Sequence, residues 1–161
     1  MLVRVISFGY GHTGTLADDD HTPLEPPTAD ITLDLRRTLH DPHRNPAMRH
    51  LTGLDAPVYA HVLATPGARL LAHTTALAAH TLATEAQRSV VVAVGCVGGR
   101  HRAVGVAREI HRSLAAFAAA GAYTADLVHR DVHRPVLPAA RHAELDARAA
   151  ARRQRSEGAA E

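Results

Sequence analysis

Residues 89–102, SVVVAVGCVGGRHR, decide the fold. In the first half, 89–95, Ser89 is followed by an unbroken apolar run rich in β-branched residues, which is typical of a central strand in a parallel sheet. Glycines then end the strand, and from residue 103 to about 120 apolar side chains recur at helical spacing. The stretch therefore predicts a strand, a glycine-rich loop and a helix, which is the beginning of a βαβ unit.

The rest of the chain continues this alternation. Residues 58–88 are rich in Ala and Leu, with a break at Pro66-Gly67, and they predict one short and one long helix. The predicted strands are residues 2–8, 29–35, 89–95 and 123–129. Alternating strands and helices predict an α/β class: a small, mainly parallel sheet with flanking helices. We place this domain at 1–138, followed by a C-terminal helix and a frayed Arg-rich tail at 139–161.

Length and composition favour one globular domain. The chain has 161 residues, of which 46% are hydrophobic and 21% charged, close to the averages of globular proteins. No apolar run reaches about 18 residues, so no membrane-spanning helix and no membrane partner are expected. The N-terminus is unlike a secretory signal, and a single cysteine excludes an internal disulfide framework. A cytoplasmic location is the expectation.

Charge is distributed unevenly between the two halves. Residues 1–85 contain 6 Arg and 9 acidic residues, whereas residues 86–161 contain 12 Arg and 7 acidic residues. An anionic partner should therefore meet the second half. Aromatic residues make up only 3% of the chain, which argues against a surface that stacks on nucleic-acid bases.

The glycine-rich loop has the character of an anion site. Its glycines allow successive backbone N–H groups to point into one concavity, at the positive end of a helix. Arg100, His101 and Arg102 stand where helices usually carry acidic or hydroxyl residues, and such cations cost about 0.3–1 kcal/mol each. A bound phosphate would reverse the sign of these interactions. The loop residues expected to bind it are Gly95, Cys96, Val97, Gly98, Gly99, Arg100, His101 and Arg102.

Other interpretations of the same loop stay open. It could be a tight turn whose Arg side chains extend into solvent. Cys96 and Arg102 also have the Cys-x5-Arg spacing of the tyrosine-phosphatase loop, in which a thiolate attacks phosphorus and the Arg binds the phosphate oxygens. Cys96 could equally be a small, buried and unreactive side chain. A third class is an interaction module that binds no ligand.

Two further residue groups bear on ligand and metal binding. Asp34 and Arg36 end the predicted strand 29–35, where a carboxylate could hold sugar hydroxyls or an ammonium and an Arg could hold phosphate. Their alternative is a local ion pair. Thirteen histidines suggest a metal site, and two pairs of them are closely spaced, at 40/43 and 129/133. The chain has no second cysteine to join Cys96 as a ligand, so no metal and no cofactor are expected.

The segment GCVGGRHRAV, residues 95–104, resembles the GCTGG-[KR]-HRSV signature of the RNase adapter proteins, the RapZ family. Further segments agree in order with that family: SFGYGH at 7–12, LDLR at 33–36 followed by LHDP at 39–42, Arg49 with LTGLD at 51–55, and His129-Arg130. The resemblance covers about residues 3–135 and concerns the family's C-terminal domain only. Where the family's pattern has a lysine this chain has Gly11, and where it has a threonine in the loop this chain has Val97.

This resemblance implies a sensor of a phosphorylated ligand, either glucosamine 6-phosphate or a nucleotide, rather than an enzyme, since no Walker A sequence is present. The resemblance also implies regulation through RNA or a regulatory protein. Whether the chain forms a homo-oligomer is left open by the sequence. The Arg-rich C-terminal tail could meet RNA phosphates or simply be a solvated helix face. Beside the loop, the resemblance implies that the ligand site is lined by Ser7, His12, Asp34, Arg36, Arg49 and Thr52.

Overall fold

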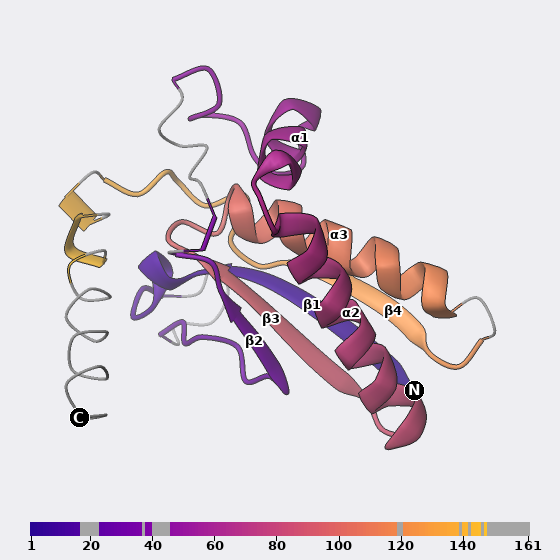
Figure 1. Cartoon of the computed structure of the whole chain (residues 1–161). Coiled ribbons are helices and arrows are strands. Elements are labelled where there is room, and N and C mark those ends of the chain that lie inside the picture. The colour runs from indigo at the N-terminus through magenta and orange to yellow at the C-terminus, as the bar shows by residue number, and fades with distance from the viewer. Residues whose placement is uncertain are drawn as a thin grey trace, which may run out of the picture.

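The four strands form one all-parallel sheet in the order β2-β3-β1-β4 (Figure 1). The computed structural model describes residues 1–16, 23–36, 38–39, 46–118, 121–138, 140–141, 143–145 and 147. The strands are β1 Leu2–Gly9, β2 Ile31–Asp34, β3 Val90–Cys96 and β4 Thr124–His129. The helices are η1 Tyr10–His12, α1 Ala56–Ala64, α2 Ala68–Glu85 and α3 Arg102–Phe117. The predicted α/β class is confirmed. Most of the predicted tail at 139–161 lies outside the described residues.

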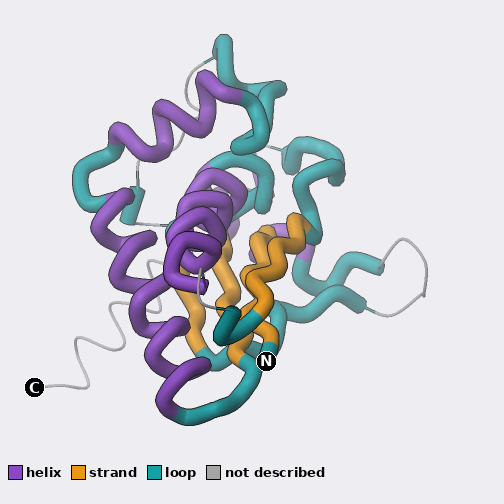
Figure 2. The backbone as a smooth tube through the Cα atoms, turned by 90° about the vertical axis from the view of Figure 1, so that its right-hand side faces the viewer, coloured by secondary structure: helices purple, strands orange, loops and turns teal. Residues whose placement is uncertain are grey.

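Helices α2 and α3 pack side by side against one face of the sheet (Figure 2). Val3 and Val5 of β1 and Val92 and Val94 of β3 are fully buried on that face, because alternate side chains of a strand point the same way. The helices meet this layer with small side chains, which let α2 approach the sheet and α3 closely. The buried alanines of α2 are Ala68, Ala72, Ala76, Ala79 and Ala83.

The connection from β3 through α3 to β4 is the βαβ unit that the sequence predicts, but its strands are not neighbours. β1 lies between β3 and β4 and pairs with both of them. The sheet register brings the carboxyl ends of the strands to one edge, where Gly9 pairs with Cys96 and Asp34 with Gly95. Ligands of open α/β sheets bind at this edge, so the fold brings the predicted site segments together. Within the described residues, no helix is long and apolar enough to cross a membrane.

A buried carboxylate joins α1 to α3. Glu109, whose side chain is 5% exposed, accepts hydrogen bonds from the Tyr59 hydroxyl at 2.5 Å and from Arg112 Nη2 at 2.6 Å. The hydrogen bonds from Arg112 lower the pKa of Glu109 to about 2, against the opposing effect of burial. Burial and the neighbouring Glu109 raise the pKa of Tyr59. The network therefore stabilises the fold only while Glu109 is ionised.

Acid should destabilise the protein through Glu109. Because the folded state lowers the pKa of this carboxyl, its contribution is complete above the unfolded pKa of 4.5 and is lost as the pH falls toward 2. We expect about 2 kcal/mol, discounted because Arg112 is largely exposed. Urea unfolding of the wild type and Glu109→Gln at pH 7 and pH 3 measures it. The difference between the two proteins should shrink at pH 3, and a constant difference would contradict this origin.

Candidate anion-binding site

The loop between β3 and α3 lies directly on the end of β1. A Cβ atom added at Gly99 would lie 2.7 Å from the backbone nitrogen of Gly9, and one added at Gly9 would lie 2.7 Å from the carbonyl carbon of Gly98. Gly99 also has a φ of +69°, a conformation that side chains other than glycine rarely adopt. Two glycines of the predicted loop therefore fix its path by close backbone contact with β1.

Helix α3 begins at Arg102 without a side-chain cap. Its N-cap residue, His101, makes no capping hydrogen bond through its ring, and no acidic residue stands in the first turn. In the part of the chain that the structure describes, the backbone N–H groups of Gly98 and Arg100 donate to no carbonyl. Gly98 is half-buried, and a Cβ there would meet only Leu137 Cδ1, at 4.0 Å. Gly98 is thus the loop glycine with most room beside its backbone.

Arg100 and Arg102 bind carbonyl groups of neighbouring loops. The Arg102 side chain is 4% exposed, and its Nη1 donates to the carbonyls of Leu35, Arg36 and Leu39 at 3.0–3.3 Å. Arg100 Nη1 donates to the carbonyls of Val132 at 3.0 Å and Arg134 at 2.6 Å. These carbonyls offset part of the electrostatic cost of placing cations at a helix N-terminus. The two arginines tie together the segments that follow β2, β3 and β4.

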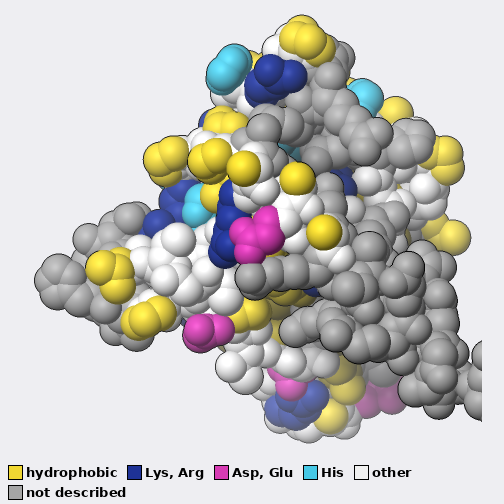
Figure 3. Space-filling model, turned by 90° about the vertical axis from the view of Figure 1, so that its left-hand side faces the viewer, with side chains coloured by type: hydrophobic (Ala, Val, Ile, Leu, Met, Phe, Trp, Pro, Cys, Tyr) yellow, Lys and Arg dark blue, Asp and Glu magenta, His cyan; other side chains and the backbone are white. Residues whose placement is uncertain are grey.

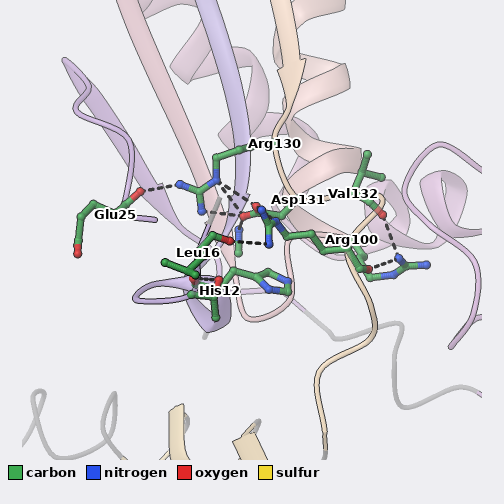
Figure 4. A network of polar contacts seen from close by, with 10 residues as sticks. His12, Leu16, Glu25, Arg100, Arg130, Asp131 and Val132 are labelled. Atoms are coloured by element: carbon green, nitrogen blue, oxygen red, sulfur yellow. Dashed lines mark hydrogen bonds and ion pairs between the residues drawn. The ribbon is translucent and has the colours of Figure 1, made fainter. Parts of the chain in front are cut away.

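A buried aspartate just after β4 completes this arrangement, and motif reasoning missed it. Asp131 is 0% exposed, and its Oδ2 accepts the backbone N–H of Gly9 at 2.7 Å. It pairs with Arg130 at 2.7 Å and with Arg134 at 3.2 Å. Arg130 also donates to the carbonyl of Glu25, and Figure 4 shows it between Glu25 and Asp131. The sequence signal is the run RDVHR at 130–134, which follows a predicted strand immediately.

His12 is buried beside the same network (Figure 4). Its side chain is 5% exposed, and among the described residues its Nε2 atom has no hydrogen-bond partner. Burial and the charge of Arg134 lower the pKa of His12, whereas Asp131 and a backbone hydrogen bond with Gly98 raise it. A neutral imidazole in this place still has one ring nitrogen to satisfy. Of the residues that the family resemblance implies, His12 therefore retains an unused polar atom next to the loop.

Four other residues predicted for the site have structural partners, namely Ser7, Asp34, Arg36 and Thr52. Ser7 Oγ lies 2.8 Å from His129 Nδ1, and the Ser7 side chain is fully buried. Burial, Arg108 and the neighbouring histidines lower the pKa of His129. Asp34 and Arg36 form an ion pair, with Arg36 Nε 2.8 Å from Asp34 Oδ1. This is the local ion pair that the sequence offers as the alternative to a ligand-binding role for these two residues.

Arg36, Arg49 and Thr52 differ in how they are placed. The guanidinium of Arg36 stacks on the ring of Tyr10, 3.9 Å from its centroid. Thr52 donates through its backbone N–H and its hydroxyl to Asp55 Oδ2, at 2.7 and 3.0 Å, immediately before α1. Arg49 is exposed in the turn that precedes Thr52. Thr52 thus has a local structural role at the start of α1.

Cys96 is part of the hydrophobic core. It is 3% exposed and packs among the apolar side chains beneath the helices. Because the Arg102 guanidinium is bound to carbonyl groups, the Cys-x5-Arg spacing does not bring an exposed thiol to an exposed guanidinium. The arrangement gives no support to nucleophilic catalysis by Cys96.

The surface around the sheet edge is rich in basic groups. Among the described residues, the arginines near the loop are Arg36, Arg100, Arg102, Arg130 and Arg134, and the acidic residues are Asp34, Asp55 and Asp131. Basic and histidine side chains are scattered over the coloured part of the face in Figure 3. No group of three or more His, Cys, Asp or Glu among the described residues could hold a metal ion. In the described part of this edge, arginines therefore outnumber aspartates.

Comparison with known proteins gives relatives over about two thirds or more of the chain. A nucleotide-binding protein of Thermus thermophilus is 38% identical over 136 residues, which is 83% of this chain and 44% of that protein. Another from Rhodospirillum centenum is 40% identical over 136 residues, 82% of this chain and 36% of that protein. A third, from Streptomyces coelicolor, is 40% identical over 113 residues, 68% and 36% of the two chains. This chain spans less than half the length of these curated relatives.

The family comparison agrees with the order of motifs along the sequence. Residues 1–133 match the family described as RapZ C-terminal domain. That range includes all four strands, the glycine-rich loop and Asp131, and it ends just before Arg134. The match covers far more than half of the 161 residues. The chain belongs to the RapZ C-terminal domain family.

Proposed function

We propose that this domain binds a small phosphorylated ligand at the loop 96–102 and serves in regulation. The observation that carries the proposal is the pair of backbone donors, Gly98 and Arg100, without acceptors among the described residues. They lie in the loop just before the uncapped N-terminus of a 16-residue helix, and the side chains of Arg100, Arg130 and Arg134 contact the segment that follows β4 beside it. Phosphate oxygens accept hydrogen bonds and carry the charge that this end of a helix favours.

His12 supports a ligand with more than a phosphate group. Its buried Nε2 requires a hydrogen-bond partner, and a sugar hydroxyl or an amine next to the phosphate supplies one. Relatives named as nucleotide-binding proteins agree with this chemistry. The candidate ligands are therefore a nucleotide or an amino-sugar phosphate such as glucosamine 6-phosphate. The bound state would be passed on to RNA or to a regulatory protein.

Two substitutions at Gly98 test the proposal. Gly98→Pro removes the backbone N–H, whereas Gly98→Ala keeps it, and the added Cβ has room at this position. Losing one hydrogen bond to a charged acceptor costs about 1.5–3 kcal/mol, so Gly98→Pro should weaken binding at least tenfold. Gly98→Ala should bind much as the wild type does. Calorimetry with inorganic phosphate, glucosamine 6-phosphate and nucleotides measures this effect.

The outcomes separate the classes of function. No binding of any phosphorylated compound by the wild type would reject the proposal and favour an interaction module. Equal affinity for Gly98→Pro and Gly98→Ala would show that the loop donors do not hold the ligand. Hydrolysis of an aryl phosphate that disappears in Cys96→Ser would restore the phosphatase alternative.

A further inference from the structure

The segment that follows Arg134 reaches the proposed phosphate loop through Leu137, which packs on Gly11 beside it. We infer that residues 135–138, which we call the strap, compete with the ligand for this loop and so hold the site in an inhibited state. The inference rests on the proposed function and concerns its regulation. The match to the family ends at residue 133, so the strap lies beyond the shared domain.

Leu137 fills the space next to the loop. A Cβ atom added at Gly11 would lie 2.1 Å from Leu137 Cδ1, so the leucine occupies the place of a side chain at position 11. The same methyl group is the atom nearest to a Cβ added at Gly98, at 4.0 Å. Leu145, which is 7% exposed, approaches Gly11 from a second direction, with a corresponding distance of 3.2 Å.

This contact is placed where it obstructs a ligand. Gly11 donates its backbone N–H to the carbonyl of Val97 at 2.8 Å, so the surface that Leu137 covers is continuous with the loop. A methyl group cannot accept a hydrogen bond from Gly98, whereas a phosphate oxygen can. A Cβ at Gly98 only just touches this methyl group, and a phosphate, which is larger than a methyl, would meet the Leu137 side chain. The strap and the ligand would therefore compete for this place.

Arg100 connects the loop to the base of the strap. Its guanidinium donates to the carbonyls of Val132 and Arg134, the residues just before the strap. A phosphate oxygen is a stronger acceptor than a neutral carbonyl, because the hydrogen bond is then charge-assisted on both sides. A ligand that recruits Arg100 therefore weakens the attachment of the strap. Ligand binding and release of the strap are thus coupled through one side chain.

Removing the strap contact should strengthen binding. In Leu137→Ala the competing side chain is lost, and we expect inorganic phosphate to bind about three- to tenfold more tightly than in the wild type. The reason is that the apparent affinity falls with the fraction of molecules in which the strap covers the site. Leu70→Ala is the matched control, since Leu70 is 68% exposed on the distant helix α2. Calorimetry on the full chain at constant ionic strength measures the affinities.

Proteolysis gives a second readout that does not depend on affinity. Arg141 lies just after the strap and forms an ion pair with Glu144. Inorganic phosphate should speed tryptic cleavage after Arg141 in the wild type, relative to chloride at equal ionic strength, because the strap is released. In Leu137→Ala cleavage should already be fast without phosphate. Mass spectrometry of the fragments identifies the cleaved bond.

Each result decides between the two proposals. Phosphate binding with equal or lower affinity in Leu137→Ala would overturn the strap inference and leave the proposed function standing. Slower cleavage after Arg141 with phosphate would likewise overturn it, because the ligand would then be closing the strap. Binding of phosphate by neither the wild type nor Leu137→Ala would overturn the proposed function and the inference together.

Discussion

Gly99→Ala is expected to lower the free energy of unfolding by about 3 kcal/mol, against about 1 kcal/mol for Gly67→Ala. Both glycines have a positive φ, +69° and +82°, so both substitutions bring the same kind of backbone strain. They differ in their surroundings, because a Cβ at Gly67 meets nothing within 4 Å. The difference between the two variants therefore isolates the close packing of the loop on β1.

The neighbours of Gly99 explain why the cost cannot be avoided. The added Cβ would lie 2.7 Å from the nitrogen of Gly9 and 2.9 Å from the carbonyl carbon of Phe8. Both atoms belong to the backbone of β1, a central strand that pairs on both sides, so neither can rotate away. Overpacking of this kind typically costs about 1–3 kcal/mol in addition to the strain of the left-handed conformation.

Urea unfolding followed by circular dichroism measures both variants. Gly99→Ala should also weaken phosphate binding, since the loop must shift to admit the methyl group, whereas Gly67→Ala should bind normally. Equal losses of stability in the two variants would mean that conformational strain alone matters at Gly99. The loop would then be free to move away from β1.

The elements of the fold could be predicted closely because periodicity is a local property. The strand predicted at 89–95 is Val90–Cys96, the break at Pro66-Gly67 separates α1 from α2, and the first strand differs by one residue at its end. Their order in the sheet could not be predicted in the same way. β1 lies between β3 and β4 because of long-range pairing, and no pattern within one segment encodes that position.

The candidate site could be predicted in place but not in detail. The sequence indicated the loop after β3, and the structure brings the ends of β1, β2 and β4 to it. The partners of Arg100 and Arg102 are backbone carbonyls from distant segments, which carry no side-chain signature. Asp131 was missed for a related reason, because its structural role depends on a hydrogen bond from the backbone N–H of Gly9, which is distant in the sequence.

Asp131→Asn is expected to lower the free energy of unfolding by about 3–5 kcal/mol, the cost of breaking a buried ion pair on one side. The carboxylate is 0% exposed and pairs with Arg130 and Arg134, so the amide leaves two half-buried guanidinium groups without their counterion. The amide also introduces N–H donors where donors already converge. Asparagine has nearly the same shape as aspartate, so the loss reports charge and hydrogen bonding rather than a cavity.

Asp126→Asn is the matched control, on the same strand that Asp131 follows. Asp126 lies on β4 and pairs with Arg4 at 2.7 Å, but both side chains are more than a third exposed, at 36% and 47%. Surface pairs of this kind contribute about 0–1 kcal/mol, so the control should remain near wild-type stability. Salt should reduce the small effect of Asp126→Asn more than the large effect of Asp131→Asn, because burial limits screening. Similar losses of stability in the two variants would mean that Asp131 forms a solvated ion pair. Its contacts with β1 and with the segment after β4 would then not hold the proposed site together.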